Sequence, residues 1–145
     1  MSGITDPTEE YFKDGCWGWD GTQWRKLGLI FGYYDRLAGQ VVNLNASAGE
    51  NILTGDAVPA GEIWILQAIC ALDSTSNVSR IYIRANTGTV ACVITDVYSI
   101  AAGHWFAAAT NMVMKTGDYL NCTFAGCTAG DYLYFRWWGY KMKVS

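Results

Sequence analysis

From about residue 39 to the end of the 145-residue chain, strand-like runs alternate with turn signals, and this regularity restricts the fold more than any other feature. The turns contain Gly, Pro, Asn and Asp, which supply or tolerate turn backbone angles, and they recur about every 8–14 residues. No helical pattern separates the strands, as the crossovers of a parallel sheet would require. The pattern therefore predicts an all-β fold, an antiparallel β-sandwich or jelly roll.

The spacing of the apolar residues places the predicted strands. They cover residues 40–46, 62–72, 78–85, 89–100, 104–106, 112–115, 119–124 and 131–142. In the strand over residues 78–85 the side chains alternate, with Ile81 and Ile83 on the inner face and Arg80 and Tyr82 on the outer face. Such a strand suits a sandwich that has one face against the core and the other in water.

Two predicted strands are apolar on both faces. In residues 62–72, Ile63, Ile65 and Ile69 fall on one face, and Trp64 and Leu66 fall on the other. In residues 131–142 one face carries Leu133, Phe135 and Trp137, and the other carries Tyr132, Tyr134, Arg136, Trp138 and Tyr140. Either the N-terminal part of the chain or an identical subunit covers the second face. The enrichment of Tyr, Trp and Arg at interfaces favours the subunit.

Residues 1–37 are predicted to form an N-terminal docking arm in front of a β-sandwich domain over residues 38–145. Asp6-Pro7 is a helix start, with Asp as N-cap and Pro at the first helical position, so a short helix is expected over about residues 7–13. Asp20-Gly21 predicts a two-residue turn in a small β-hairpin.

This hairpin carries three tryptophans and is too small to be stable alone. We expect their rings to pack against protein, while a platform that stacks on sugar rings is the alternative. Together with the second faces of the two apolar strands, they form the predicted subunit and partner interface. Its members are Trp17, Trp19, Trp24, Trp64, Leu66, Tyr132, Tyr134, Arg136, Trp138 and Tyr140.

The chain lacks the residue sets that catalysis or metal binding needs. His104 is the only histidine and lies in no recognisable nucleophile–base motif. Asp73, Asp118 and Asp131 stand at predicted turns, where hydrogen bonds to the turn backbone explain them. We therefore expect a non-enzymatic protein with no catalytic residues, no metal and no cofactor.

The five cysteines do not suggest a disulfide framework, because their number is odd and their spacing scattered. Cys122 and Cys127 are the only close pair. A single C-x4-C pair without a nearby His is a weak zinc signal, and a reducing compartment disfavours a disulfide between them.

Charge and hydropathy exclude several partners. The formal net charge is −3 and no basic tract occurs, so nucleic acid is not an expected partner. The N-terminus has no signal-peptide pattern and no run of 18 apolar residues occurs, which predicts cytoplasmic synthesis and no membrane contact. Charged residues make up 16% and aromatic residues 14% of the chain, so partner subunits are the simplest cover for its apolar surface.

Residues 18–27, Gly-Trp-Asp-Gly-Thr-Gln-Trp-Arg-Lys-Leu, resemble the G-x-D-G-x-x-W-x-x-L segment of many tailed-phage virion proteins. Residues 58–66 and 115–120 resemble paired stretches in jelly-roll modules of phage decoration, head-fibre and tail-fibre proteins. The resemblance covers most of residues 11–143 as a pattern, and the order of its motifs is more specific than any one of them. It implies a trimeric virion component.

The leading interpretation is an external capsid decoration (cement) protein that oligomerises, binds the major capsid protein or other virion proteins, and stabilises the particle. The alternative is the receptor- or glycan-binding head of a phage head or tail fibre. A fibre head should display an exposed aromatic groove remote from its assembly surface. A cement protein should bury its aromatic residues and its arm in protein contacts.

Overall fold

Turn residues delimit a series of strands, as the sequence predicts. The computed structural model describes residues 17–19, 22, 24–26 and 33–143, and the described residues contain no helix. The chain divides into two compact units, residues 1–34 and 35–145. The strands are β1 (Trp17–Trp19), β2 (Trp24–Lys26), β3 (Tyr33–Asn43), β4 (Gly49–Thr54), β5 (Glu62–Asp73), β6 (Val78–Thr87), β7 (Val90–Ile100), β8 (Phe106–Lys115), β9 (Tyr119–Cys127) and β10 (Leu133–Lys143).

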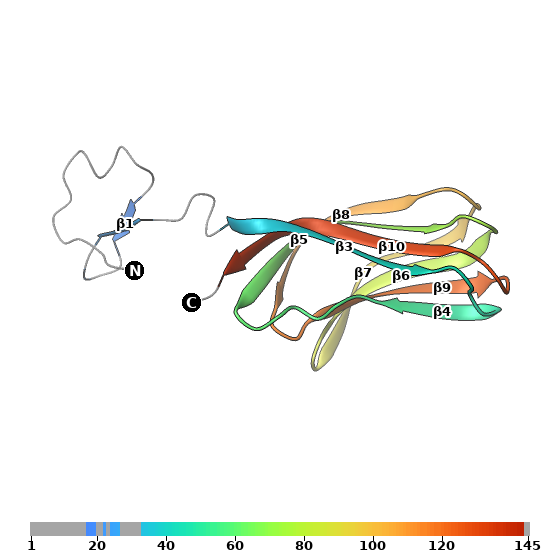
Figure 1. The fold of residues 1–145 in the computed structure, drawn as a ribbon, viewed down its shortest axis with the longest axis horizontal. Helices are drawn as coiled ribbons and strands as arrows, with labels where there is room; N and C mark the ends of the chain where they lie inside the picture. The colour runs from blue at the N-terminus through green and yellow to red at the C-terminus, as the bar shows by residue number, and fades with distance from the viewer. Residues whose placement is uncertain (1–16, 20–21, 23, 27–32, 144–145) are drawn as a thin grey trace. The chain divides into compact units, whose positions relative to one another are not determined.

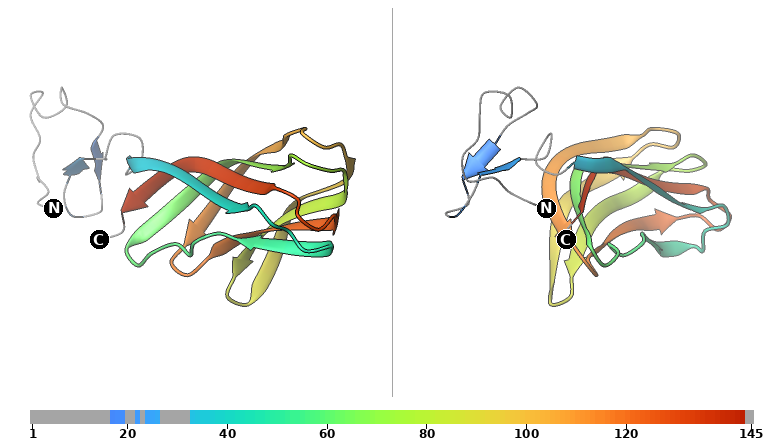
Figure 2. Two further views of the ribbon diagram at one scale, coloured as in Figure 1. Left: turned by 45° about the vertical axis from the view of Figure 1, so that its right-hand side comes forward. Right: turned by 60° about the vertical axis from the view of Figure 1, so that its left-hand side comes forward.

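The second unit is a sandwich of two four-stranded antiparallel sheets (Figures 1 and 2). One sheet has the strand order β3-β10-β5-β8 and the other β4-β9-β6-β7. After β3 the chain changes sheet at every connection except the β6–β7 hairpin. Neighbouring strands are therefore mostly distant in sequence. The predicted all-β sandwich is confirmed at this level.

Apolar side chains from both sheets fill the space between them. Ile81 and Ile83 of β6 are fully buried, as their alternation predicts, and so are Leu133 and Phe135 of β10. Trp137, also on β10, packs 5.1 Å from the Phe135 ring, measured between centroids. The Trp137 ring lies so close to Gly39 of β3 that any side chain at position 39 would collide with it.

The predicted face assignment of β5 is wrong, because the strand contains a β-bulge. The pairing of β5 with β10 skips Gln67, and the pairing with β8 also shifts there. An extra residue reverses the alternation of the side chains that follow it. The buried residues of the core-facing side are Trp64, Leu66, Ile69 and Ala71. Trp64 and Leu66 thus belong to the core and leave the predicted interface.

Other boundaries also differ from the predictions. The strand β4 was not predicted, because its sequence GENILT begins with turn-forming and charged residues. The strand β8 is continuous, where two short strands were expected. The strand β3 begins at Tyr33, and Leu37 lies in the core, so the last residues of the predicted arm belong to the sandwich. The predicted helix over residues 7–13 lies outside the described residues.

The predicted hairpin is present as the antiparallel pair of β1 and β2. Trp19 lies opposite Trp24, so the connection consists of residues 20–23 rather than the two residues Asp20-Gly21. The structure does not describe the side chains of three residues of this pair, Trp17, Trp19 and Trp24. Their role in docking therefore stays a prediction.

Candidate functional site

The outer face of the β3-β10-β5-β8 sheet exposes large apolar side chains, and we call it the β10 face. Trp138 of β10 is 44% exposed and Val113 of β8 is 64% exposed. Trp105, just before β8, is also exposed, as is Val42 of β3. Most exposed hydrophobic residues on a soluble domain occur singly, whereas contiguous apolar patches mark interaction sites.

Arg136 fixes the centre of the β10 face. Its guanidinium carbon Cζ lies 4.8 Å from the centre of the Trp105 ring, and its Nε donates a hydrogen bond to Gln40 Oε1 at 2.5 Å. The Tyr134 ring lies next to Trp105, with 6.3 Å between the ring centroids and a 56° tilt. Residues from β3, β10 and the start of β8 are thereby joined into one ordered cluster, although β5 lies between β10 and β8.

Small side chains lie beside the long side chains of β10 on the neighbouring strands. In register with Arg136 are Cys70 of β5 and Ala107 of β8, and in register with Trp138 are Ala68 and Ala109. The short side chains of these residues lie beside the long side chains of β10. A surface with long aromatic side chains next to short ones is suited to interdigitate with the surface of a partner.

The predicted interface residues of β10 largely share this face. Tyr134, Arg136 and Trp138 lie on it, and the exposed Tyr132 immediately precedes β10. Tyr140 follows the register shift between Trp138 and Gly139 and is half-buried. Whether they contact a subunit stays a prediction.

Sequence reasoning missed Trp105, Val113 and Val42. The residues between His104 and Lys115 read as two broken strands, so the alternation that places Trp105, Ala107 and Ala109 on one face was not recognised. That alternation is the signal that could have found them.

The outer face of the other sheet carries a polar cluster. Arg80 of β6 forms a bidentate pair with Asp96 of β7, at 2.8 and 2.7 Å, and the Arg80 hydrogen bond holds the pKa of the Asp96 carboxyl below its usual value. The Arg80 Cζ lies 4.5 Å from the Tyr82 ring centre and 5.3 Å from the Tyr98 ring centre. Tyr98 is 65% exposed, so this cluster also presents an aromatic ring to solvent.

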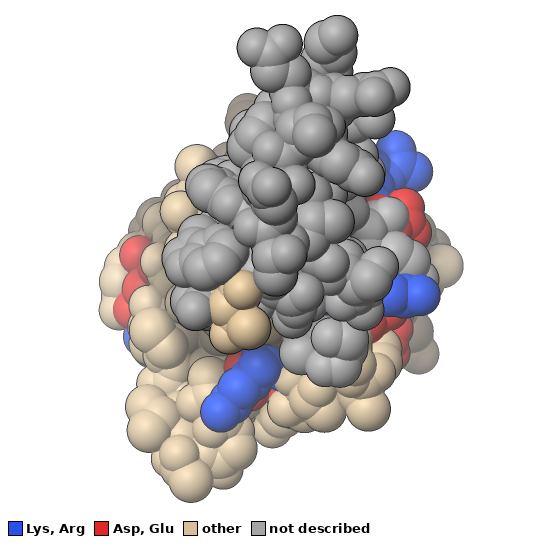
Figure 3. All heavy atoms as spheres, turned by 90° about the vertical axis from the view of Figure 1, so that its left-hand side faces the viewer, with Lys and Arg blue, Asp and Glu red and all other residues tan. Residues whose placement is uncertain are grey.

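Charges of both signs are interspersed on the surface. On the side drawn in Figure 3, the described Lys and Arg side chains lie beside Asp and Glu side chains and form no continuous basic area. Binding to a nucleic-acid backbone requires clustered cations, and the described residues visible on this side show no such cluster.

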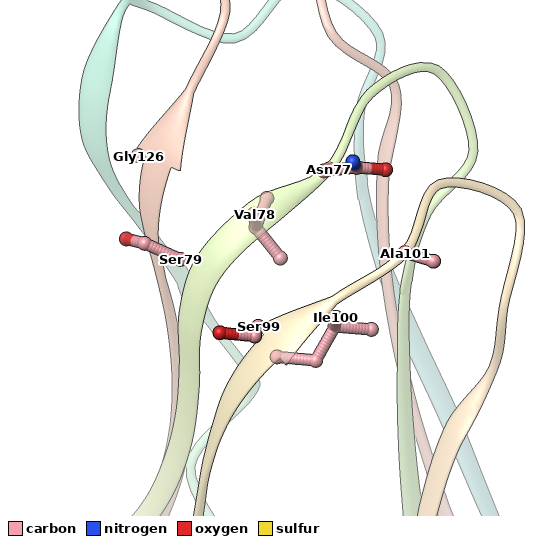
Figure 4. Close-up of a pocket in the computed structure, with 7 residues that line it drawn as sticks. All are labelled: Asn77, Val78, Ser79, Ser99, Ile100, Ala101 and Gly126. Atoms are coloured by element: carbon pink, nitrogen blue, oxygen red, sulfur yellow. The ribbon is translucent and has the colours of Figure 1, made fainter.

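A cavity of about 390 Å³ lies where β6 begins and β7 ends (Figure 4). It is lined by Asn77, Val78, Ser79, Ser99, Ile100, Ala101 and Gly126. Two of its polar side chains form hydrogen bonds with the backbone: Asn77 Oδ1 accepts the Ala102 N–H at 2.8 Å, and the Ser79 hydroxyl donates to the Ala125 carbonyl at 2.8 Å. The lining holds no titratable side chain and therefore offers no acid or base.

The remaining residues that could take part in catalysis or metal binding belong to none of the features described above. His104 is exposed, and its Nδ1 lies 3.2 Å from the Ala102 carbonyl oxygen. Cys122 and Cys127 are buried free thiols. The structure also brings Asp73, Cys127 and Asp131 together as possible metal ligands, a cluster that sequence reasoning missed because these residues belong to distant strands and connections.

No helix among the described residues is long and apolar enough to cross a membrane. No protein-family model and no curated protein matches the chain.

The comparison with solved structures finds matches of low similarity. A Drosophila NLP core, described in connection with pentamer formation and histone binding, is 16% identical over 76% of this chain and 100% of that chain, with a TM-score of 0.41. A chain of infectious bursal disease virus, Gx strain, is 12% identical over 98% of this chain, with a TM-score of 0.48, and this chain spans 38% of its length. A Bacillus endospore appendage protein, from disulfide-linked pili, is 15% identical over 83% of this chain and 100% of that chain, with a TM-score of 0.41. At these values the similarity transfers no function to this chain.

Proposed function

We propose that the protein is a non-enzymatic structural protein that self-associates through its β10 face. The exposure of Trp138, Trp105 and Val113 on one sheet face, around an ordered Arg136, carries this proposal. Trp, Tyr and Arg are the residues that supply most binding energy at interfaces. Trp and Tyr bury large areas with few rotatable bonds, and Arg offers several hydrogen-bond donors in a planar group. A second copy that covers this face would remove the apolar side chains from water.

The assembly that we propose is an external virion component, a capsid decoration protein that trimerises and stabilises the particle. The strand orders of the subunit's two sheets, β3-β10-β5-β8 and β4-β9-β6-β7, support the proposal of an eight-stranded jelly roll. The resemblance of residues 18–27 to virion proteins and the Trp-rich pair of β1 and β2 further support it. The arm would then dock on the major capsid protein or on a neighbouring subunit.

Two valines provide a matched test of the self-association. Val113 on the β10 face and Val93 on the other sheet are 64% and 58% exposed, and each lies on a strand. We expect Val113→Glu to shift the oligomer towards monomer in sedimentation velocity, because the charge would be buried at the interface. Val93→Glu should leave the oligomer intact. Equal behaviour of the two variants would refute the assigned face.

The arm is tested in the full chain by Trp19→Ala combined with Trp24→Ala. Burial of one large aromatic side chain is worth about 1.5–3 kcal/mol, so loss of two should abolish most binding to undecorated particles. Circular dichroism serves as the folding control. Undiminished binding would show that the arm does not dock.

A second candidate function, a glycan-binding fibre head, is favoured by the Arg80–Tyr82–Tyr98 cluster. This cluster lies on the sheet opposite the β10 face and exposes Tyr98 with a fixed arginine beside it. A saccharide ring could stack on Tyr98 while hydroxyl groups contact Arg80. Screening of saccharides by NMR, with Tyr98→Ala as control, distinguishes the candidates: binding that Tyr98→Ala removes would favour the fibre head.

A further inference from the structure

Three side chains that can bind a metal ion are buried together at one end of the sandwich. Asp73 ends β5, Cys127 ends β9, and Asp131 lies in the connection between β9 and β10, at the right-hand end of the sandwich in Figure 1. They are 2%, 5% and 3% exposed. One carboxylate oxygen of each aspartate and the Cys127 sulfur all lie within 4.8 Å of one another. Because a Zn²⁺ ion stands about 2.0–2.3 Å from each of its ligands, atoms with this spacing can share one ion after small side-chain movements.

Backbone N–H groups hold one oxygen of each carboxylate in place. The N–H groups of Thr75 and Ser76 donate to Asp73 Oδ1 at 2.9 and 3.1 Å. The Thr128 N–H donates to Asp131 Oδ2 at 2.6 Å. Each carboxylate is thus oriented through one oxygen and keeps a second oxygen for another partner. Carboxylates that bind metal ions are held by hydrogen bonds of this kind, which orient them for the ion.

The second oxygen of Asp73 lacks a donor. Asp73 Oδ2 is buried and receives no hydrogen bond from an N–H or hydroxyl group of the described residues. The charged group that acts on Asp73 is the Asp131 carboxylate, and both carboxylates act in turn on the Cys127 thiol. Since Oδ1 is turned to the backbone of the β5–β6 connection, Oδ2 faces these two groups. A buried oxygen without a partner costs free energy, so the arrangement calls for a ligand between the three side chains.

The charge of the two carboxylates is also uncompensated. The charged groups that act on Asp73 and Asp131 include no described Lys or Arg. His104 lies in the β7–β8 connection, but it is exposed and its Nδ1 lies 3.2 Å from the Ala102 carbonyl oxygen. Buried carboxylates are normally paired with a cation or coordinate a metal ion. The partner that this end of the sandwich lacks is therefore a cation.

The sulfur of Cys127 selects the class of cation. Ca²⁺ and Mg²⁺ take oxygen ligands, whereas thiolate ligands suit Zn²⁺ and related transition-metal ions. Three protein ligands with water at the fourth position suffice to hold Zn²⁺ in proteins. As the Zn–S bond forms, the thiol releases its proton to solvent. Ser74, Thr75 and Thr128, in the connections around the cluster, are exposed, so an ion has only a thin layer to cross.

We propose that Asp73, Cys127 and Asp131 form a Zn²⁺ site that joins the β5–β6 and β9–β10 connections. The β7–β8 connection is held at the same place, because the Gly103 N–H donates to the Asp73 carbonyl at 2.8 Å. The sequence predicted no metal, since only the fold brings Asp73 to the other two ligands. The site lies at the end of the sandwich and not on the β10 face, so the inference is independent of the proposed function.

Thermal unfolding of the full chain tests the site. The protein is first treated with EDTA and dialysed, and zinc chloride is then added near neutral pH. We expect the melting temperature to rise by on the order of 5–15 °C when free zinc exceeds its dissociation constant about 100-fold. Isothermal titration calorimetry should show one tightly bound ion per chain. An unchanged melting temperature without binding heat would overturn the proposal.

Matched variants locate the bound ion. Asp73→Asn and Cys127→Ser should each lose most of the rise, because each replaces a charged ligand by a neutral group of similar size. Asp118→Asn is the carboxylate control, since Asp118 is also buried and accepts a turn N–H, that of Lys115, at 2.9 Å. Cys92→Ser is the control for an exposed thiol. Both controls should keep the rise. If Cys127→Ser keeps it, or if a control loses it equally, the ion binds elsewhere and the proposal fails.

Cobalt(II) chloride reports on the ligands of the wild type even where a variant fails to fold. Co²⁺ in place of Zn²⁺ should give a thiolate-to-metal charge-transfer absorption that Cys92→Ser retains. The absence of this absorption in the wild type would contradict a thiolate ligand. Calcium chloride is the last comparison and should not raise the melting temperature. A rise with calcium that Cys127→Ser keeps would show a site of oxygen ligands only and would overturn the assignment to Zn²⁺.

Discussion

The guanidinium carbon of Arg136 lies 4.8 Å from the centre of the Trp105 ring, although a whole strand, β5, separates the strands that position these two residues. The residues in register with Arg136 on β5 and β8, Cys70 and Ala107, have small side chains. This planar cation held on an aromatic ring, on an exposed apolar face, is the feature that most directly supports the proposed self-association.

Arg136→Lys should weaken self-association while leaving the fold intact. Lysine keeps the charge but loses the planar stacking on Trp105 and the fork that reaches Gln40. Cation–π contacts are worth about 0.5–2 kcal/mol, so we expect a dissociation constant raised roughly 3- to 30-fold in sedimentation equilibrium. An unchanged constant would mean that the cluster lies outside the interface.

Trp137→Ala and Trp138→Ala should behave in opposite ways. Trp137 is 3% exposed and packs in the core, so its truncation should cost about 3–5 kcal/mol in urea unfolding. Trp138 is 44% exposed, so its truncation should affect assembly more than the stability of the subunit. Similar unfolding and similar assembly of the two variants would show that the face assignment of β10 is wrong.

Gly139→Ala should destabilise the sandwich. A methyl group at this register shift would collide with the backbone carbonyl oxygen of Ile65, which cannot move without disturbing β5. Overpacking of this kind costs about 1–3 kcal/mol or more. The exposed neighbour Gln67 offers the control, since Gln67→Ala should stay within about 0.5 kcal/mol in the same urea titration.

The four cysteine thiols that the structure describes should react in two classes. Burial raises the pKa of the Cys70, Cys122 and Cys127 thiols, that of Cys127 to about 11, which keeps them protonated and shielded. Cys92 is exposed. Maleimide labelling near neutral pH, mapped by mass spectrometry, should modify Cys92 in the native protein and the three buried thiols after unfolding. Fast native labelling of Cys122 would contradict the placement of β9.

Local sequence rules predicted the features that depend on local alternation. The inward Ile81 and Ile83 and the two faces of β10 up to Trp138 follow from period-two spacing alone. The bulge at Gln67 was not predictable in this way, because this strand is apolar on both faces and the spacing of its apolar residues therefore does not reveal an extra residue. Only the pairing with β10 and β8 shows the shift.

Features that depend on topology were also missed. Trp105 meets Arg136, and Asp73 meets Asp131, only because the chain changes sheet at nearly every connection. Asp73 was expected to be a turn carboxylate, and its hydrogen bonds to Thr75 and Ser76 bear this out. Its burial beside a second acidic residue, Asp131, could be recognised only from the three-dimensional fold.

The most direct test of self-association is the molar mass of the purified full chain in solution, measured by multi-angle light scattering at micromolar concentration. The β10 face predicts a stable oligomer, and the proposed trimer predicts about three times the 16.0 kDa mass of one chain. A different closed oligomer would correct the symmetry and keep the face. A well-behaved species of 16.0 kDa would contradict the account.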